Sequence, residues 1–337
     1  MNSKKLILIV FFAVSTLALP LRAQDDFDEL IQGSVADADY LLEGYAAPLM
    51  KVMGYGLNQG WYNTAATHKL AGFDLTITGS PIYFPSSDLF YSVDNSKLKS
   101  LELVSPTPTG GIGSVPTIFG PDNAPIYKNK NTGLSFSGPP GLDIKGNFGN
   151  YIPVPMVQLG FGLPKGFELK MRFMPKTKIG DNGKVDLLGF GVMHDIKQYI
   201  PGIKSLPFDL SAFVGFTKMK LDVGLDSSKP DQHAIFEATT TTIQGLISKK
   251  IAVLTVYGGL GYNIAKTTLA MKGNYEFENP APAAPTVIKD PVNFDVTANG
   301  MRATAGLRLK LAVFTFHADY TLQKYKALTV GFGINVR

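Results

Sequence analysis

The sequence predicts an all-β fold: a transmembrane, antiparallel, up-and-down β-barrel of about twelve strands, within a range of about ten to fourteen. Three observations lead to this prediction. Many segments alternate apolar and polar residues with a period of two, the periodicity of a β-strand with one apolar face. An apolar stretch typical of an export signal lies near residue 10. After residue 23, no apolar stretch reaches the roughly eighteen residues that indicate a membrane-spanning helix.

The first 23 residues have the composition of a secretory signal peptide. Lys4 and Lys5 precede an apolar run over residues 6–19, and small or polar residues resume near Ala23. At about fourteen residues, this run is shorter than the roughly twenty residues of a spanning helix. We therefore expect residues 1–23 to be removed on export, with a retained anchor as the alternative.

Composition excludes several classes of protein. Residues 1–23 contain three basic residues and no acidic one, so their removal lowers the formal net charge from +5 to +2. No Lys/Arg-rich stretch with interleaved aromatic residues occurs, so nucleic acid is not an expected partner. The chain contains no cysteine, which excludes disulfides, a thiol nucleophile and cysteine-ligated metals. We expect neither a cofactor nor a metal site.

The alternating segments favour a membrane barrel over a soluble β-sandwich. Across residues 166–174, apolar side chains such as Phe167 alternate with charged ones such as Glu168. The same pattern occurs in residues 72–84, 207–222, 301–309, 312–320 and 327–337. Strands of a soluble sandwich average about five or six residues. Several of these segments have nine or more, a length that suits a tilted strand crossing the outer membrane.

The connections between the expected strands support the same fold. Short links alternate along the chain with longer links rich in Pro, Gly and Asp. The short links are residues 163–166, 248–250 and 310, and the longer ones are residues 176–184, 224–232 and 279–291. Short periplasmic turns and long external loops are typical of outer-membrane barrels. Residues 195–206 are an exception, long enough for a short helix at residues 196–199.

Residues 85–150 are the least regular part of the expected barrel. They are rich in Gly, Pro, Ser and Asn, with weak strand signals at residues 98–104 and 142–148. Nine strands are expected after residue 150, and residues 72–84 add one. Because both ends of a barrel lie in the periplasm, this region can hold only an even number of strands. Two strands here give the total of about twelve.

A helical segment is expected before the barrel, within residues 24–66. Apolar and aromatic residues recur there at helical spacing: Tyr40, Leu41, Tyr45, Leu49, Val52 and Met53. Pro48 should kink or restart the helix. The segment either fills the lumen as a plug or lies under the barrel in the periplasm. Residues 67–337 then form the barrel.

Two resemblances agree with this organisation. Asn63-Thr64-Ala65, before the first expected strand, is similar to the end of the amino-terminal hatch in outer-membrane transporters typified by the long-chain fatty acid channel, where the motif is Asn-Pro-Ala. That resemblance implies a hatch that plugs a fourteen-stranded barrel and a ligand that leaves sideways through the wall. The whole chain, including residues 194–201 and 206–209, resembles a family of uncharacterised Gram-negative outer-membrane barrels, and this likeness covers nearly all of the mature chain. That second likeness implies a fold and a location but no activity.

The expected lumen is mixed in character. Its charged or titratable residues form an expected charge network: Glu168, Lys170, Arg172, Asp209, Arg302, Arg308, His317 and Asp319. Apolar residues share the same face, which suggests a filled or ligand-holding interior rather than an open pore. The candidate contacts for a hydrophobic ligand are Tyr40, Tyr45, Met53, Trp61 and Tyr62. Packing of the plug against the wall is the alternative role for these five residues.

Catalysis is not expected. The chain has no Gly-x-Ser-x-Gly or His-Glu-x-x-His motif, and His317 and Asp319 are expected to join the lumen network rather than a catalytic pair. The leading hypothesis is an outer-membrane barrel that binds or passes a small hydrophobic molecule. The alternatives are a structural or interaction barrel without transport, with residues 85–150 as its external surface, and a lipid-modifying enzyme. The expected partners are outer-membrane lipid and the barrel-insertion machinery.

Overall fold

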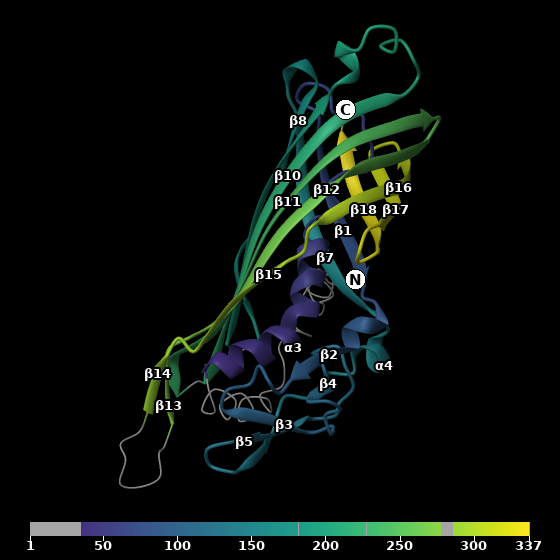
Figure 1. The fold of residues 1–337 in the computed structure, drawn as a ribbon. Helices are drawn as coiled ribbons and strands as arrows, with labels where there is room; N and C mark the ends of the chain where they lie inside the picture. Colours follow the sequence, from purple (N-terminus) through teal and green to yellow (C-terminus); the bar gives the residue numbers. More distant parts are fainter. Residues whose placement is uncertain (1–34, 181, 227, 278–285, 337) are drawn as a thin grey trace.

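The computed structural model describes residues 35–180, 182–226, 228–277 and 286–336. Its main body is a closed antiparallel barrel (Figure 1). Eleven strands form the wall, and β15 and β16 share one position beside β12, so the ring has ten positions. The wall strands are β1 (Phe73–Tyr83), β7 (Tyr151–Gly162), β8 (Phe167–Ile179), β9 (Gly183–Asp195), β10 (Asp209–Asp226), β11 (Lys229–Ile251), β12 (Leu254–Lys272), β15 (Val292–Thr297), β16 (Gly300–Leu311), β17 (Phe314–Leu322) and β18 (Ala327–Val336).

The ring closes because its first and last strands pair. β1 runs antiparallel to β18 from Phe73↔Val336 to Ile82↔Ala327, and β11 pairs with β12 along most of its length. The predicted fold class is therefore confirmed. The ten positions lie within the expected range but below the expected twelve, because the region between β1 and β7 contributes no strand to the wall.

Side chains along the wall follow the predicted alternation. On β18, Val330, Phe332 and Ile334 are exposed on the outer face, whereas Thr329 and Asn335 are buried toward the lumen. Neighbouring strands carry the same exposed apolar face. Among the described residues, no helix is long and apolar enough to cross a membrane.

The two ends of the barrel differ in their connections. We call the end at Phe73 and Val336 the seam end. Two of its connections are two-residue turns, at residues 252–253 and 312–313, in which the first residue has a positive φ as tight hairpins require. Its long connection is residues 196–208, which contains the 3-10 helix η4 (Lys197–Tyr199).

The opposite end, which we call the loop end, has the two longest connections. One of them contains the paired strands β13 (Asn274–Phe277) and β14 (Thr286–Lys289). The other is residues 84–150, the loop-end unit, which forms two small sheets beside the barrel (Figure 1). The elements of the unit are η2 (Ser86–Leu89), β2 (Phe90–Asp94), β3 (Leu101–Ser105), β4 (Ile112–Pro116), β5 (Ile126–Asn129), β6 (Ser135–Ser137) and α4 (Ile144–Phe148).

The loop-end unit corrects two expectations. The strand signal at residues 98–104 corresponds to β3, but β3 pairs with β5 and not with the wall. The signal at residues 142–148 is wrong, because this stretch forms the short helix α4. Asp143 precedes the helix, and its carboxylate accepts a hydrogen bond from the N–H of Gly146 at 3.2 Å. Such an N-cap favours a helical turn over a strand.

The helix α3 (Val35–Gly56) lies against the lumen side of the wall and continues through Pro48. It contacts β12, β15 and β1. Gly54 allows this close packing, because a Cβ there would lie 3.0 Å from the Cβ of Ala265 on β12. The buried face of α3 joins the main hydrophobic core of the protein. The end of α3 is therefore packed inside the barrel, against its wall.

Candidate functional site

The chain after α3 runs through the lumen as an extended segment. We call residues 57–66 the plug segment. Its polar groups bond to side chains from several wall strands. The carbonyl of Trp61 accepts from Gln158 at 3.1 Å, and the N–H of Ala65 donates to the hydroxyl of Ser248 at 3.0 Å. The lumen is therefore occupied by the protein's own chain rather than open.

Two buried arginines hold the start of the plug segment. Arg172 on β8 donates to the carbonyls of Leu57 and Gln59, at 2.8 and 2.5 Å. Arg302 on β16 donates to the carbonyl of Asn58, at 2.7 Å. All three carbonyls follow the last residue of α3, Gly56. The two guanidinium groups thus bind the backbone of the plug segment, which explains cations in the lumen without carboxylate partners.

Aromatic packing fixes the middle of the plug segment. The guanidinium of Arg172 lies 3.5 Å from the centre of the Trp61 ring, a cation–π contact. Trp61 also packs on Phe213, with ring centres 5.5 Å apart. Gly191 and Gly215 leave room for the indole, because a Cβ on either would lie within 3.0 Å of it. Trp61 thus serves as an anchor in the lumen.

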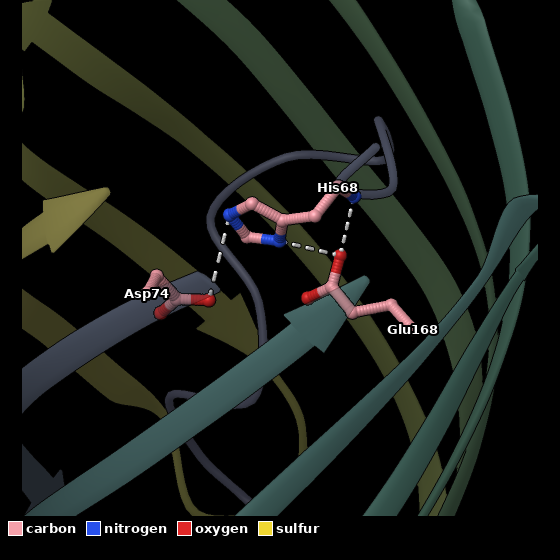
Figure 2. A group of neighbouring side chains, drawn as sticks. All are labelled: His68, Asp74 and Glu168. Atoms are coloured by element: carbon pink, nitrogen blue, oxygen red, sulfur yellow. Dashed lines mark hydrogen bonds and ion pairs between the residues drawn. The ribbon is translucent and has the colours of Figure 1, made fainter. Parts of the chain in front are cut away.

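A polar cluster fastens the end of the plug to the wall at the seam end. The N–H of His68 donates to Glu168 Oε2 at 2.9 Å, and His68 Nδ1 lies 2.9 Å from the same oxygen. His68 Nε2 lies 3.8 Å from Asp74 Oδ1. Figure 2 shows the imidazole lying between the two carboxylates, which come from β1 and β8. Lys170 forms an ion pair with Glu168 on its other side.

The same cluster has the residue types of a metal site. One ligand atom from each of His68, Asp74 and Glu168 lies within 4.8 Å of the other two. A divalent cation would have to displace Lys170 from Glu168 and the side chain of Asn335 from His68, whose nitrogens are 2.5 Å apart. Because these partners already satisfy the cluster, we interpret it as a fastening between plug and wall.

The residues of the expected charge network do not form a single set of ion pairs. Glu168 and Lys170 pair with each other, but Asp319 accepts from the hydroxyl of Tyr257 at 2.8 Å. Arg308 and His317 are buried without a hydrogen bond or ion pair to the described residues. Asp209, the remaining residue of the expected network, lies at the seam end. It is half-buried, and its carboxylate accepts a hydrogen bond from the hydroxyl of Ser248. The physical reason is that Arg172 and Arg302 donate to backbone carbonyls of the plug segment, and the alternation of the strands cannot reveal such partners.

Most of the predicted ligand contacts are packing residues. Tyr40 and Tyr45 bond to backbone carbonyls of the loop-end unit, at 3.4 and 2.9 Å, and Tyr62 donates to Gln244 at 2.6 Å. The ring of Tyr91 lies against Gly44 of α3, and burial raises the pKa of its hydroxyl. Met53, on α3, is the one of the five predicted contacts that lines the apolar cavity described below.

The wall has a gap between β7 and β8. Their ladder joins residues 158–162 to residues 168–172 and stops there. On their other sides, both strands stay paired toward the loop end, β7 with β1 and β8 with β9. Residues 151–157 and 173–179, all of which the structure describes, therefore face each other without a ladder. We call this the wall gap.

Prolines on the facing edges help to explain the wall gap. The N–H of Leu163 donates to the carbonyl of Phe167 at 2.8 Å, and β7 keeps an unbroken register with β1, so odd-numbered residues of β7 direct their backbone groups toward β8. Pro153 and Pro155 are odd-numbered and have no N–H to donate. Pro175, which also lacks an N–H, lies within a register shift of β8. Because an unpaired N–H is costly in lipid, the prolines also lower the cost of leaving these edges open.

An apolar cavity of about 190 Å³, the wall cavity, lies at the wall gap. From the plug side it is lined by Met53 and Leu57. From the outer face it is lined by three exposed residues: Ile77, Val157 and Phe173. Its other lining residues, on β7 to β10, are also all apolar: Ile152, Pro153, Val154, Pro155, Met156, Met174, Pro175, Ile179, Val185, Leu187, Met219 and Leu221. The cavity thus extends from the end of α3 to the outer face of the barrel.

Comparison with known proteins places the chain in a family. Residues 2–336 match the model of a family of unknown function, DUF6588. The chain belongs to this family. The prediction of an uncharacterised barrel family is thereby confirmed. No curated protein matches the sequence.

The chain also has a weak similarity to several solved structures. The translocator domain of the autotransporter NalP from Neisseria meningitidis is 12% identical, with 86% of this chain and 93% of that chain covered, at a TM-score of 0.30. The toluene transporter TbuX from Ralstonia pickettii is 8% identical, with 81% and 91% covered, at a TM-score of 0.24. The fold described above depends on the strand pairing of this chain itself.

Proposed function

We propose that this family member is an outer-membrane barrel, exported with removal of residues 1–23, that binds a small apolar molecule in the wall cavity. The molecule passes sideways between the lipid and the interior through the wall gap. Its partners are the surrounding lipid, the barrel-insertion machinery and this ligand.

The outer membrane location is supported by the surface of the barrel. The outer face is a continuous set of exposed apolar side chains, including Phe161, Phe190 and Phe332. Large exposed apolar patches are unfavourable in water and mark membrane or protein contacts. Outside the wall gap, the paired strands of the barrel satisfy the backbone hydrogen bonds of the wall without water, as a membrane requires.

The wall cavity is the observation on which the proposal depends. An engineered apolar cavity of about 150 Å³ stays dry and binds benzene. At about 190 Å³, the wall cavity is large enough for a single-ring or short-chain apolar molecule. Its lining contains no charged or hydrogen-bonding side chain, so binding would depend on apolar burial alone.

A lateral route fits this barrel better than an axial one. The plug segment fills the lumen, where Trp61 is 1% exposed and Arg172 is fully buried. An open channel would need a polar, water-filled interior. The wall gap instead joins the cavity to the outer face without moving the plug. No step of this route requires catalysis, and the proposal includes no enzymatic role.

Binding can be tested by filling the cavity from β9. Val185 lines the cavity and is 2% exposed, whereas Val192 on the same strand is on the outer face and is 44% exposed. We expect Val185→Phe to abolish binding of fluorobenzene to the purified protein, measured by ¹⁹F NMR against empty micelles. Val192→Phe makes the same chemical change outside the cavity and should bind as the native protein does. Equal binding by both variants would exclude the wall cavity as the site.

Passage can be tested by locking the gap, since the native chain offers no competing cysteine. Continuing the β7–β8 register places Val157 opposite Phe173, the first unpaired positions. A disulfide between cysteines at these two positions should lower uptake of radiolabelled benzene by intact cells, with recovery on reduction. A disulfide between cysteines at Phe161 and Leu169, which are already paired, is the control. Unchanged uptake with a locked gap would exclude passage through the wall gap. The protein would then be a binding or structural barrel without transport.

A further inference from the structure

The chain passes once through the barrel before the first wall strand begins. At the loop end, Asp37 of α3 accepts hydrogen bonds from backbone N–H groups at residues 99–101 of the loop-end unit, at 2.8 to 2.9 Å. The plug segment then crosses the lumen, and His68 reaches the cluster at the seam end. From Phe73, β1 returns toward the loop end (Figure 1). The direction of travel is therefore from loop end to seam end.

The connections indicate which end faces outward. Barrels of the outer membrane have short turns in the periplasm and longer loops outside. The seam end has the two-residue turns at 252–253 and 312–313 and the tight turn at 163–166. The loop end also has short connections, after β8, β10 and β17, but its 84–150 unit and its connection at 273–291 are the two longest in the barrel. The loop end therefore faces the exterior, and residues 196–208 are the long exception on the periplasmic side.

From these two observations we infer that α3 enters the barrel from the outside, so that its first turn, with Ala36, is presented on the cell exterior beside the loop-end unit. The inference depends on membrane insertion alone and not on any ligand of the wall cavity.

The packing of the lumen fixes the direction in which α3 and the plug segment run. Tyr55 donates to the carbonyl of Asn299 at 2.9 Å, and Arg302 holds Asn58 from the same strand region. Beyond these contacts toward the seam end, Trp61 and Tyr62 are packed against the wall and nearly fully buried. The three hydrogen bonds to Asp37 fix the first turn of α3 at the outer end.

The absence of cysteine allows the inference to be tested by site-directed labelling without background. Single cysteines are placed at three exposed positions: Ala36 at the start of α3, Asn131 in the loop-end unit and Ser205 in the seam-end connection. Each variant is treated with a membrane-impermeant maleimide on intact cells and after permeabilisation of the outer membrane. Each variant is also run on a detergent gel with and without boiling. Faster migration of the unboiled sample than of the boiled one shows that the barrel is folded.

We expect Ala36→Cys and Asn131→Cys to label on intact cells as strongly as after permeabilisation, and Ser205→Cys to label only after it. Labelling of Ala36→Cys only after permeabilisation, alongside Ser205→Cys, would overturn the inference. Labelling of Ser205→Cys alone on intact cells would overturn it as well, because the barrel would then be reversed. An epitope inserted ahead of Val35, detected by antibody on intact cells, gives a second reading without changing α3.

Discussion

Removal of the Arg172 guanidinium should loosen the plug while leaving the barrel closed. Arg172 and Arg308 are both buried in the lumen, but Arg172 bonds to two plug carbonyls and Arg308 bonds to none of the described residues. Methionine has a similar length and no charge. Arg172→Met therefore removes the contacts, and Arg308→Met is the matched control for loss of one buried charge.

The size of the effect follows from the groups left behind. The carbonyls of Leu57 and Gln59 lose their donor, and each unsatisfied buried carbonyl costs about 1 to 3 kcal/mol. Loss of the cation–π contact with Trp61 adds about 1 kcal/mol, and relief of the buried charge offsets part of the total. We expect a net cost of about 3 kcal/mol, which corresponds to about 150-fold in the open population of the plug.

The open population can be read from a protected cysteine. Ala65 is 1% exposed in the plug segment, so Ala65→Cys reacts with a maleimide only when the plug is released. In this background we expect Arg172→Met to raise the labelling rate by about a hundredfold and Arg308→Met to change it by less than about threefold. Similar rates for the two variants would refute the assignment of Arg172 as a residue that holds the plug segment in the lumen.

Two further predictions concern other contacts. Asp37→Ala should leave the N–H groups at residues 99–101 without their acceptor and lower the local stability of the loop-end unit by roughly 2 kcal/mol. Added protease should then cleave the loop-end unit faster, and unchanged cleavage would contradict this role of Asp37. Gly331→Ala should lower the melting temperature of the protein in detergent, because the new Cβ would lie 2.2 Å from the ring of His317. Gly245→Ala is the control, because no atom lies within 4 Å of its Cβ position, and equal melting temperatures for the two variants would argue against this packing.

The wall could be predicted because each strand meets two different environments. On β8, Phe167 and Leu169 face outward and Glu168 and Lys170 face the lumen, so local alternation carries the whole signal. The loop-end unit could not be predicted in the same way. Its strands are three to five residues long and packed on α3, so their pairing depends on distant chain rather than on local pattern.

The candidate site was only partly predictable for a related reason. The sequence indicates that Arg172 faces the lumen, but its partners are carbonyls, which every residue has and no composition reveals. The wall gap could not be predicted either, because the alternation within one strand does not show which residues of the neighbouring strands it pairs with. Its one sequence signal was the placement of Pro153, Pro155 and Pro175 within otherwise regular strands.

The plug also constrains the order of assembly. The plug segment leads into β1 through His68, and β1 is one of the two strands that close the ring. Drawing a helix and an indole through an already closed ring would break most lumen contacts at once, and folded chains rarely thread in this way. The ring therefore closes around its contents, and β1 meets β18 only after α3 is in place. Interior and wall are products of one folding event.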